Sequence, residues 1–395
     1  MKRLFIVLAL VIFIAAMVFS GCTKTPQEGK VLKVGVIWGL TGPSSQSQLA
    51  WRDAVLLCAD YINQKGGVTV KGEKYKIQCV VEDNKNSPPG SVSAATKLVF
   101  QDKVKFIVGG VVPVVNEGIM SITEPNKVLY VSMRTDIVRP DKPYFFCPAY
   151  SFAAPLPGLY QVIREKYPTV KSVGYIVEDE TGARAVGEVS KNIAQGMGFS
   201  VLAPEIHPWE STEYFPVWTK IIGNKPDAMD IGLKLPNTTA ACVKQGRELG
   251  YKGPMIAATA GDPNDIINMI GSKDLATDFL YPALDVYGTS APPMVKEMVK
   301  LWEAKYKTRL DEGGPDSWDT LYVLVQAIEK AQSLDPTDVK NAWETMDTFQ
   351  SIKGTAKMGG AKSFGIKHMG FPPCPIIRLQ NGQVEFIKWF DAYMP

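Results

Sequence analysis

The stretch that most constrains the fold runs from Val31 to Val68 and reads VLKVGVIWGLTGPSSQSQLAWRDAVLLCADYINQKGGV. Residues 32–37 are mostly apolar and β-branched, which is typical of a parallel strand covered on both faces. After the turn Thr41-Gly42-Pro43, apolar residues recur at the spacing of one helix face, at Ala54, Leu57, Cys58, Tyr61 and Ile62. Gly66-Gly67 then supplies a helix stop. Strand, turn and helix in this order indicate the opening of a βαβ unit.

The same unit recurs along the chain. Four strand–helix units are expected by Ser132, and a second series begins at Phe152, with further strands near residues 172, 200, 228 and 254. This alternation predicts an α/β fold with parallel sheets. A length of 395 residues is sufficient for two cores. The formal charge is +3, and no basic run is interleaved with aromatic residues, so a nucleic-acid surface is not expected.

The N-terminus has the pattern of an export signal. A short basic start is followed by an apolar core at residues 4–18 and by Phe19-Ser20-Gly21-Cys22. Small residues immediately before a cysteine resemble a bacterial lipobox, in which Cys22 becomes the lipidated first residue, although Phe19 stands where Leu is usual. A simple cleaved secretory peptide is the alternative. The polar residues that follow predict a flexible tether.

Three segments resemble the periplasmic branched-chain amino-acid-binding protein family. The first stretch is similar to its GVxxxLTGP-like strand and turn and to its helix ending in INxxGGV. The segment PDSWDTLYVLVQAIEKA is similar to its YDAxxxLAxAIxKA helix, and PIIRLQNGQVEFIKW to its closing hairpin with Asn-Gly at the turn. For the first stretch alone, a generic flavodoxin-like half is the alternative.

The resemblance implies a type I periplasmic binding protein fold, with two doubly wound parallel-sheet lobes joined by three crossings. The expected division of the chain is a signal peptide at 1–21, a tether at 22–31, a first lobe from 32–149 and 283–370, and a second lobe from 150–282 and 371–395.

The resemblance also implies a disulfide. Cys58 lies on the apolar face of the first predicted helix and Cys79 near the end of the second predicted strand. An adjacent helix and strand can bring two cysteines within bonding reach, and an oxidising compartment favours pairing. Family members often carry a bridge at this place.

Catalytic motifs are not found. The sequence contains no GxSxG, P-loop, HExxH, CxxC or GxGxxG after a strand. His207 and His368, the two histidines, cannot by themselves form a histidine-rich metal site. Carboxylates such as Glu178 and Glu180 follow a strand and could serve acid–base chemistry, but they lack a companion nucleophile. We therefore expect no enzymatic activity, no cofactor and no metal, and expect ligand binding between two closing lobes.

Candidate ligand residues in the first lobe lie after predicted strands, where open α/β sheets place ligands. Trp38 ends the first strand. By resemblance to the family, backbone N–H groups near Val115, together with Asn116, stand where a serine-rich turn binds the ligand carboxylate. Thr135 keeps the role of a threonine that binds this carboxylate, and Arg134 precedes it.

In the second lobe, Lys234 takes the place of a family aromatic residue, and Thr259 replaces the acid that pairs with the ammonium of an amino acid. A buried ammonium without a carboxylate partner costs several kcal/mol. The expected ligand is therefore a small organic anion without an α-ammonium, with aromatic bulk against Trp38 and with Arg134 and Lys234 as cations. The alternative is that both cations are solvated loop residues.

The resemblance implies an exported, lipid-anchored receptor on the outer face of the bacterial cell membrane. Its partners would be a small carboxylate-bearing or amino-acid-like ligand and the permease subunits of an ABC importer. A ligand sensor of the same fold, coupled to a regulator, is one alternative. A secreted α/β hydrolase is another, and it would need a nucleophile and base within reach.

Overall fold

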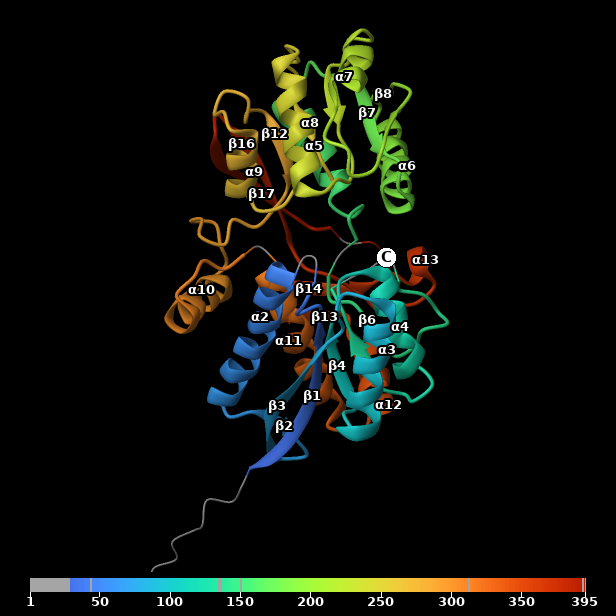
Figure 1. Cartoon of the computed structure of the whole chain (residues 1–395), viewed down its shortest axis with the longest axis vertical. Coiled ribbons are helices and arrows are strands. Elements are labelled where there is room, and N and C mark those ends of the chain that lie inside the picture. Colours follow the sequence, from blue (N-terminus) through green and yellow to red (C-terminus); the bar gives the residue numbers. More distant parts are fainter. Residues whose placement is uncertain are drawn as a thin grey trace, which may run out of the picture.

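Two lobes, each built around one main β-sheet, make up the computed structural model of this chain (Figure 1). The structure describes residues 29–42, 45–133, 137–149, 151–311, 313–392 and 394. The predicted α/β fold of type I periplasmic binding proteins is confirmed, because each lobe carries a largely parallel sheet with helices on both faces.

The sheet of lobe 1 has the order β2-β3-β1-β4-β5-β6. Its central strand β1 (Lys30–Trp38) pairs in parallel with β3 on one side and β4 on the other, so the chain leaves the sheet in opposite directions at this point. Such a switch point opens a crevice at the carboxyl ends of the strands. The other strands are β2 (Val68–Val70), β3 (Glu73–Asp83), β4 (Phe106–Gly109), β5 (Leu129–Val131) and β6 (Phe145–Phe146).

Two apolar clusters cover the faces of this sheet. On one face, alternate residues of β1 such as Val34 and Val36 pack with α2 (Ser45–Gln64), α10 (Pro293–Tyr306), α11 (Gly314–Ala331) and α12 (Pro336–Glu344). On the other face, Ile37 packs with α3 (Pro88–Thr96), the π-helical η1 (Lys97–Gln101) and α4 (Pro113–Thr123). The alternation follows from the period of two in a strand.

A small antiparallel sheet completes lobe 1. It contains β13 (Thr348–Ser351), β14 (Gly354–Gly359) and β15 (Met369–Phe371), with the short helix α13 (Ala361–Phe364) between the last two strands. Phe349 and Met358 bury their side chains in the same cluster as α11. The turn between β13 and β14 is therefore held against that helix.

The sheet of lobe 2 has the order β17-β16-β12-β11-β10-β7-β8, with β9 paired to β7. Strands β7 to β12 pair in parallel, and the closing hairpin of β16 and β17 is antiparallel. The strands are β7 (Ser172–Glu178), β8 (Ser200–Val201), β9 (Glu205–His207), β10 (Ala228–Asp230), β11 (Met255–Ile256), β12 (Phe279–Pro282), β16 (Cys374–Gln380) and β17 (Gln383–Phe390).

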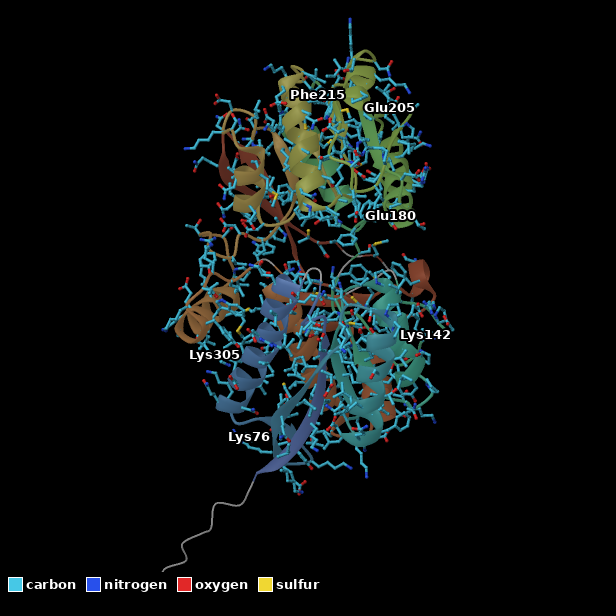
Figure 2. All side chains as sticks on the ribbon, viewed as in Figure 1. Lys76, Lys142, Glu180, Glu205, Phe215 and Lys305 are labelled. Atoms are coloured by element: carbon cyan, nitrogen blue, oxygen red, sulfur yellow. The ribbon has the colours of Figure 1, made fainter. Side chains whose placement is uncertain are left out.

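Helices again cover both faces of this sheet. One cluster contains α5 (Leu156–Lys166) and α6 (Thr181–Gly196), and the other contains α7 (Phe215–Ile222), α8 (Pro236–Glu248) and α9 (Pro263–Ile270). Glu180, which follows β7 and caps α6, lies at the edge of lobe 2 that faces lobe 1, whereas Glu205 and Phe215 lie near the opposite end (Figure 2). The carboxyl end of β7 therefore points toward lobe 1.

The chain passes between the lobes three times along the described residues: between β6 and α5, between β12 and α10, and between β15 and β16. The sequence placed the hairpin correctly, because Asn381 and Gly382 both have positive φ, of 51° and 69°, as the turn of a two-residue hairpin requires. None of the described helices combines the length and hydropathy that a membrane span would need.

The expected disulfide is not formed. Cys58 and Cys79 pack against the same face of the lobe 1 sheet, but both are free thiols. Spacing along a helix and a strand predicts the shared face, whereas a disulfide also needs Cβ atoms about 4 Å apart. Burial raises the pKa of the Cys79 thiol to about 12, so this thiol stays protonated at neutral pH.

Candidate functional site

A cavity of about 280 Å³ lies where the two lobes meet. Its walls come from both lobes and from two of the crossings, and they are mainly apolar. The residues that line it are Trp51, Val111, Met133, Ala149, Phe152, Ala258, Thr259, Pro282, Ala283, Leu284, Gly313, Asp316 and Lys353. Val111 follows β4 and Ala258 follows β11, so the cavity lies at the carboxyl ends of parallel strands, where open α/β sheets bind ligands.

Trp51 forms the aromatic part of the wall. It projects from the first half of α2, and its indole Nε1 donates a hydrogen bond to Asp311 Oδ1 at 3.1 Å. The same carboxylate oxygen accepts from the backbone N–H groups of Gly313 and Gly314, both at 3.0 Å. Residue 313 must be small here, because a Cβ atom on it would lie 2.2 Å from the Trp51 Nε1 atom. Asp311 thus joins α2 to the start of α11.

Asp316 and Lys353 are the charged residues of the cavity wall within the described part of the chain. Lys353 Nζ lies 2.6 Å from Asp316 Oδ1. Asp316 is in the first turn of α11, and Lys353 is in the turn between β13 and β14. Burial lowers the pKa of Lys353, but the attraction and hydrogen bond of Asp316, with the charge of Asp319, outweigh this and raise the pKa overall. Lys353 is therefore a cation at neutral pH.

Asp319, one turn further along α11, holds the turn that carries Lys353. Its carboxylate accepts hydrogen bonds from the Ser351 hydroxyl and, at 2.8 Å, from the Ile352 N–H group. The Lys353 N–H group in turn donates to Ser351 Oγ at 3.0 Å. Asp319 is buried, and this burial raises the pKa of its carboxyl to about 7 against the hydrogen bonds that lower it. The backbone at Lys353 is thus fixed to the same helix as Asp316.

Trp38 does not line the cavity. Its side chain is fully buried, and its ring packs edge-on against Trp51 with 5.7 Å between ring centroids. The aromatic residue at the cavity is therefore Trp51, with Trp38 behind it. The sequence carried a signal for this, because Trp51 lies three residues before Ala54 and so extends the apolar face of the predicted helix toward the loop.

Val115 and Asn116 are buried within lobe 1. Asn116 Nδ2 donates to Ser132 Oγ at 3.2 Å, and Asn116 Oδ1 accepts from the Tyr130 hydroxyl at 2.8 Å. The side chain of Asn116 therefore joins α4 to β5, and Val111, just before that helix, is the residue that lines the cavity. Arg134 and Thr135, like Cys22, lie outside the described residues.

The proposed role of Lys234 as a cleft cation is wrong. Its side chain is fully buried in lobe 2, with Nζ 2.6 Å from Glu178 Oε1 and 4.9 Å from the centre of the Tyr214 ring. The Tyr214 hydroxyl donates to the same Glu178 oxygen. The alternative of a solvated loop cation is also wrong. Sequence position after β10 placed Lys234 at the correct edge of the sheet, but it did not reveal Glu178, the partner that neutralises it.

Thr259 does line the cavity, after β11. Asp316 and Lys353 were missed by sequence reasoning. For Asp316 the signal was its place in the first turn of a well-predicted helix. For Lys353 there was little signal, because it lies outside the three segments that resemble the family. The carboxylate of Asp316 also weakens the argument that the cleft lacks a partner for an ammonium.

No group of three or more His, Cys, Asp or Glu side chains within the described ranges is arranged to hold a metal ion. The described polar groups of the cavity are a threonine and one ion pair among apolar walls. Such a site can enclose and orient a small molecule, with contacts from both lobes.

Solved structures with this fold cover nearly the whole chain. A leucine binding protein from Thermotoga maritima is 20% identical, with a TM-score of 0.70, and the match covers 91% of this chain and 99% of that one. A branched-chain amino acid transporter substrate binding protein from Streptococcus pneumoniae, in complex with isoleucine, is 18% identical, with a TM-score of 0.71 and coverage of 91% and 100%.

A solute binding protein of an ABC transporter from Rhodopseudomonas palustris, in complex with 3,4-dihydroxybenzoic acid, is 19% identical, with a TM-score of 0.69 and coverage of 92% and 98%. These likenesses show the fold. Residues 31–377, most of the chain, also match the family described as periplasmic binding protein. The chain therefore belongs to the periplasmic binding protein family.

Proposed function

We propose that this protein is the extracytoplasmic solute-binding receptor of an ABC importer, and that its two lobes close on a small carboxylate-bearing ligand. The observation that carries this proposal is the cavity of about 280 Å³ between the lobes, lined from both of them. A ligand that contacts both lobes favours the closed arrangement, because it gains binding free energy only when the lobes approach. Permease subunits of the importer would recognise this closed form.

The cavity lining supports a ligand with an apolar body. Trp51, Met133, Phe152 and Leu284 offer hydrophobic contact, while Thr259 and Lys353 offer hydrogen-bond donors for a carboxylate. Similar structures hold isoleucine or 3,4-dihydroxybenzoic acid, so the same fold accepts both amino acids and aromatic acids.

The proposal includes export and lipid attachment through Cys22, on the outer face of the cell membrane, and it includes no catalytic step. A ligand sensor would use the same cavity, but its closed form would bind a regulator rather than permease subunits. Co-purification with permease subunits in mild detergent would support the importer, whereas capture of a regulator without permease would support the sensor.

Native mass spectrometry of protein purified without refolding tests ligand binding directly, because tightly held solutes remain bound. Calorimetry with isoleucine, leucine, benzoate and 3,4-dihydroxybenzoate then measures affinity, and small-angle X-ray scattering measures closure. We expect one carboxylate to bind and to reduce the radius of gyration. Trp51→Ala should weaken this binding strongly, while Phe215→Ala, in lobe 2 and far from lobe 1 (Figure 2), should not. Absence of any bound solute or closure would refute the proposal.

A further inference from the structure

The two charges of the cavity are unequally exposed. The Asp316 side chain is 32% exposed, whereas that of Lys353 is 5% exposed, although their charged atoms are 2.6 Å apart. A buried ammonium needs a negative partner, because leaving it unpaired costs several kcal/mol. Lys353 therefore needs an anionic partner at all times. Asp316 is not itself buried, so another anion can replace it as that partner.

The backbone that carries Lys353 is held in place by hydrogen bonds to α11. The Lys353 N–H group is bonded to Ser351, and Ser351 and Ile352 are both bonded to Asp319 in α11. The ammonium is thus presented to the cavity from a turn with fixed geometry. Preorganised donors of this kind bind an anion without paying to order the receptor.

Asp316, by contrast, can leave Lys353 without becoming an isolated buried charge. It lies in the first turn of α11, where the positive end of the helix dipole stabilises negative charge. About a third of its side chain is already exposed, so water can solvate the carboxylate after a small rotation.

We propose that Asp316 is a displaceable counter-ion and that the carboxylate of the ligand takes its place at Lys353 Nζ. This inference rests on the proposed receptor function and deepens it by assigning the anion-binding residue. It predicts a monocarboxylate with an apolar body and without an ammonium group of its own. An uncharged solute cannot compensate Lys353 in this way, so Asp316 excludes neutral molecules of similar shape by staying in place.

Two variants should change affinity in opposite directions. In Lys353→Gln the ammonium is lost, and benzoate or 3,4-dihydroxybenzoate, whichever binds the unaltered protein, should bind at least about tenfold more weakly. In Asp316→Asn the competing charge is lost but an oxygen that can accept from Lys353 remains, so the same carboxylate should bind about tenfold more tightly. Benzamide, which has the same ring and no charge, should not bind the unaltered protein measurably.

Lys353→Arg is the matched control, since it keeps the cation and should retain most of the affinity for the carboxylate. If Lys353→Gln does not fold, Lys353→Arg and Asp316→Asn still test the inference. A purely structural role for the ion pair would make both Lys353→Gln and Asp316→Asn weaken binding, and this result would overturn the inference.

Other outcomes are equally informative. If Asp316→Asn weakens isoleucine binding, Asp316 is a partner for the ligand ammonium rather than a competitor, and the inference is wrong. If the unaltered protein binds an uncharged solute and none of the carboxylates, the inference fails while the receptor function stands. If it binds no small molecule at all, the receptor function itself fails.

Discussion

Single residues show how burial changes the role of a charged side chain. Lys234 follows a strand at the cleft-facing edge of lobe 2, as a ligand residue should, but it is fully buried against Glu178. Lys353 comes from a segment with weak sequence signal, and it lines the cavity. Sequence position predicts the edge of the sheet on which a residue lies. It does not predict which partner neutralises the residue, because that partner comes from another element.

Replacement of Lys234 by Met should destabilise the protein and leave ligand affinity unchanged. Removing one member of a buried ion pair leaves the other charge uncompensated, which costs about 3–5 kcal/mol. Urea unfolding measures this loss. The control is Lys305→Met, which breaks an exposed ion pair between Lys305 on α10 (Figure 2) and Asp60 on α2 and should cost less than about 1 kcal/mol. A loss of ligand affinity in folded Lys234→Met protein would show that Lys234 does take part in ligand binding.

Asp319 should make stability depend on pH. Burial raises the pKa of its carboxyl to about 7 in the folded protein, compared with about 3.9 in an unfolded chain. The folded state therefore binds this proton more tightly, so the stabilisation is complete below about pH 4 and is lost as the pH rises to about 7. The unfolding free energy of the unaltered protein should fall across this range.

Denaturant unfolding at several pH values, compared between the unaltered protein and Asp319→Asn, isolates this contribution. The variant should show a shallower decline. Glu124→Gln serves as the reference, because burial also raises the pKa of the Glu124 carboxyl to about 7. This variant should also make the decline of the unfolding free energy with pH shallower. An unchanged slope in Asp319→Asn would show that Asp319 is not a source of the pH dependence.

At the scale of elements, the sequence predicted those whose local pattern and capping agree. Helix α2 has the predicted apolar face, with Ala54, Leu57 and Cys58 buried, and it ends before Gly66 and Gly67, which both have positive φ. The closing hairpin follows from Asn-Gly. Strand β9 and helix α9 were not predicted, and the second series, which was expected to begin at Phe152, starts with helix α5 at Leu156. Short elements bury few residues of their own, so their conformation depends on tertiary packing.

The sheet of β13, β14 and β15 is the most informative omission. Strands β14 and β15 contain glycines, and β14 also contains Lys357, a composition that weakens a strand signal. Packing of Phe349 and Met358 into the core of lobe 1 supplies the missing stability. Lys353 could not be predicted as a cavity residue, because the two strands that flank its turn, β13 and β14, were not predicted.

Gly313→Ala tests how the start of α11 shapes the cavity. The backbone at residue 313 has φ −78° and ψ −14°, which alanine accepts, but its Cβ atom would lie 2.2 Å from Trp51 Nε1. We expect displacement of the Trp51 ring, a stability loss of about 1–3 kcal/mol and weaker ligand binding by calorimetry.

Gly196→Ala is the matched control, because no atom lies within 4 Å of its Cβ position. This residue ends α6, so alanine should leave stability equal or raise it by up to about 1 kcal/mol. If Gly313→Ala behaves like Gly196→Ala in both measurements, the contact between residue 313 and Trp51 does not shape the site.

At the scale of the whole molecule, strand β1 begins at the end of lobe 1 that is furthest from lobe 2 (Figure 1). An anchor attached upstream would therefore hold the protein by lobe 1 and leave the cleft accessible. If acyl chains on Cys22 attach the protein, as proposed, replacing Cys22 by Ser should release it from the membrane fraction. Detergent, but not high salt, should release the unaltered protein. Continued sedimentation of Cys22→Ser with membranes would show that another feature attaches it.

The two lobes contribute different kinds of residue to the cavity and would therefore act at different steps of ligand binding. Both charges that line it within the described residues belong to lobe 1, while lobe 2 contributes Ala258 and Thr259. An anionic solute would first bind to the open face of lobe 1 by displacing Asp316 from Lys353, and lobe 2 would then trap it. Because this ion pair carries no net charge, salt should change the association rate little. Substitution of Thr259 should leave association unchanged and shorten the residence time of the bound solute.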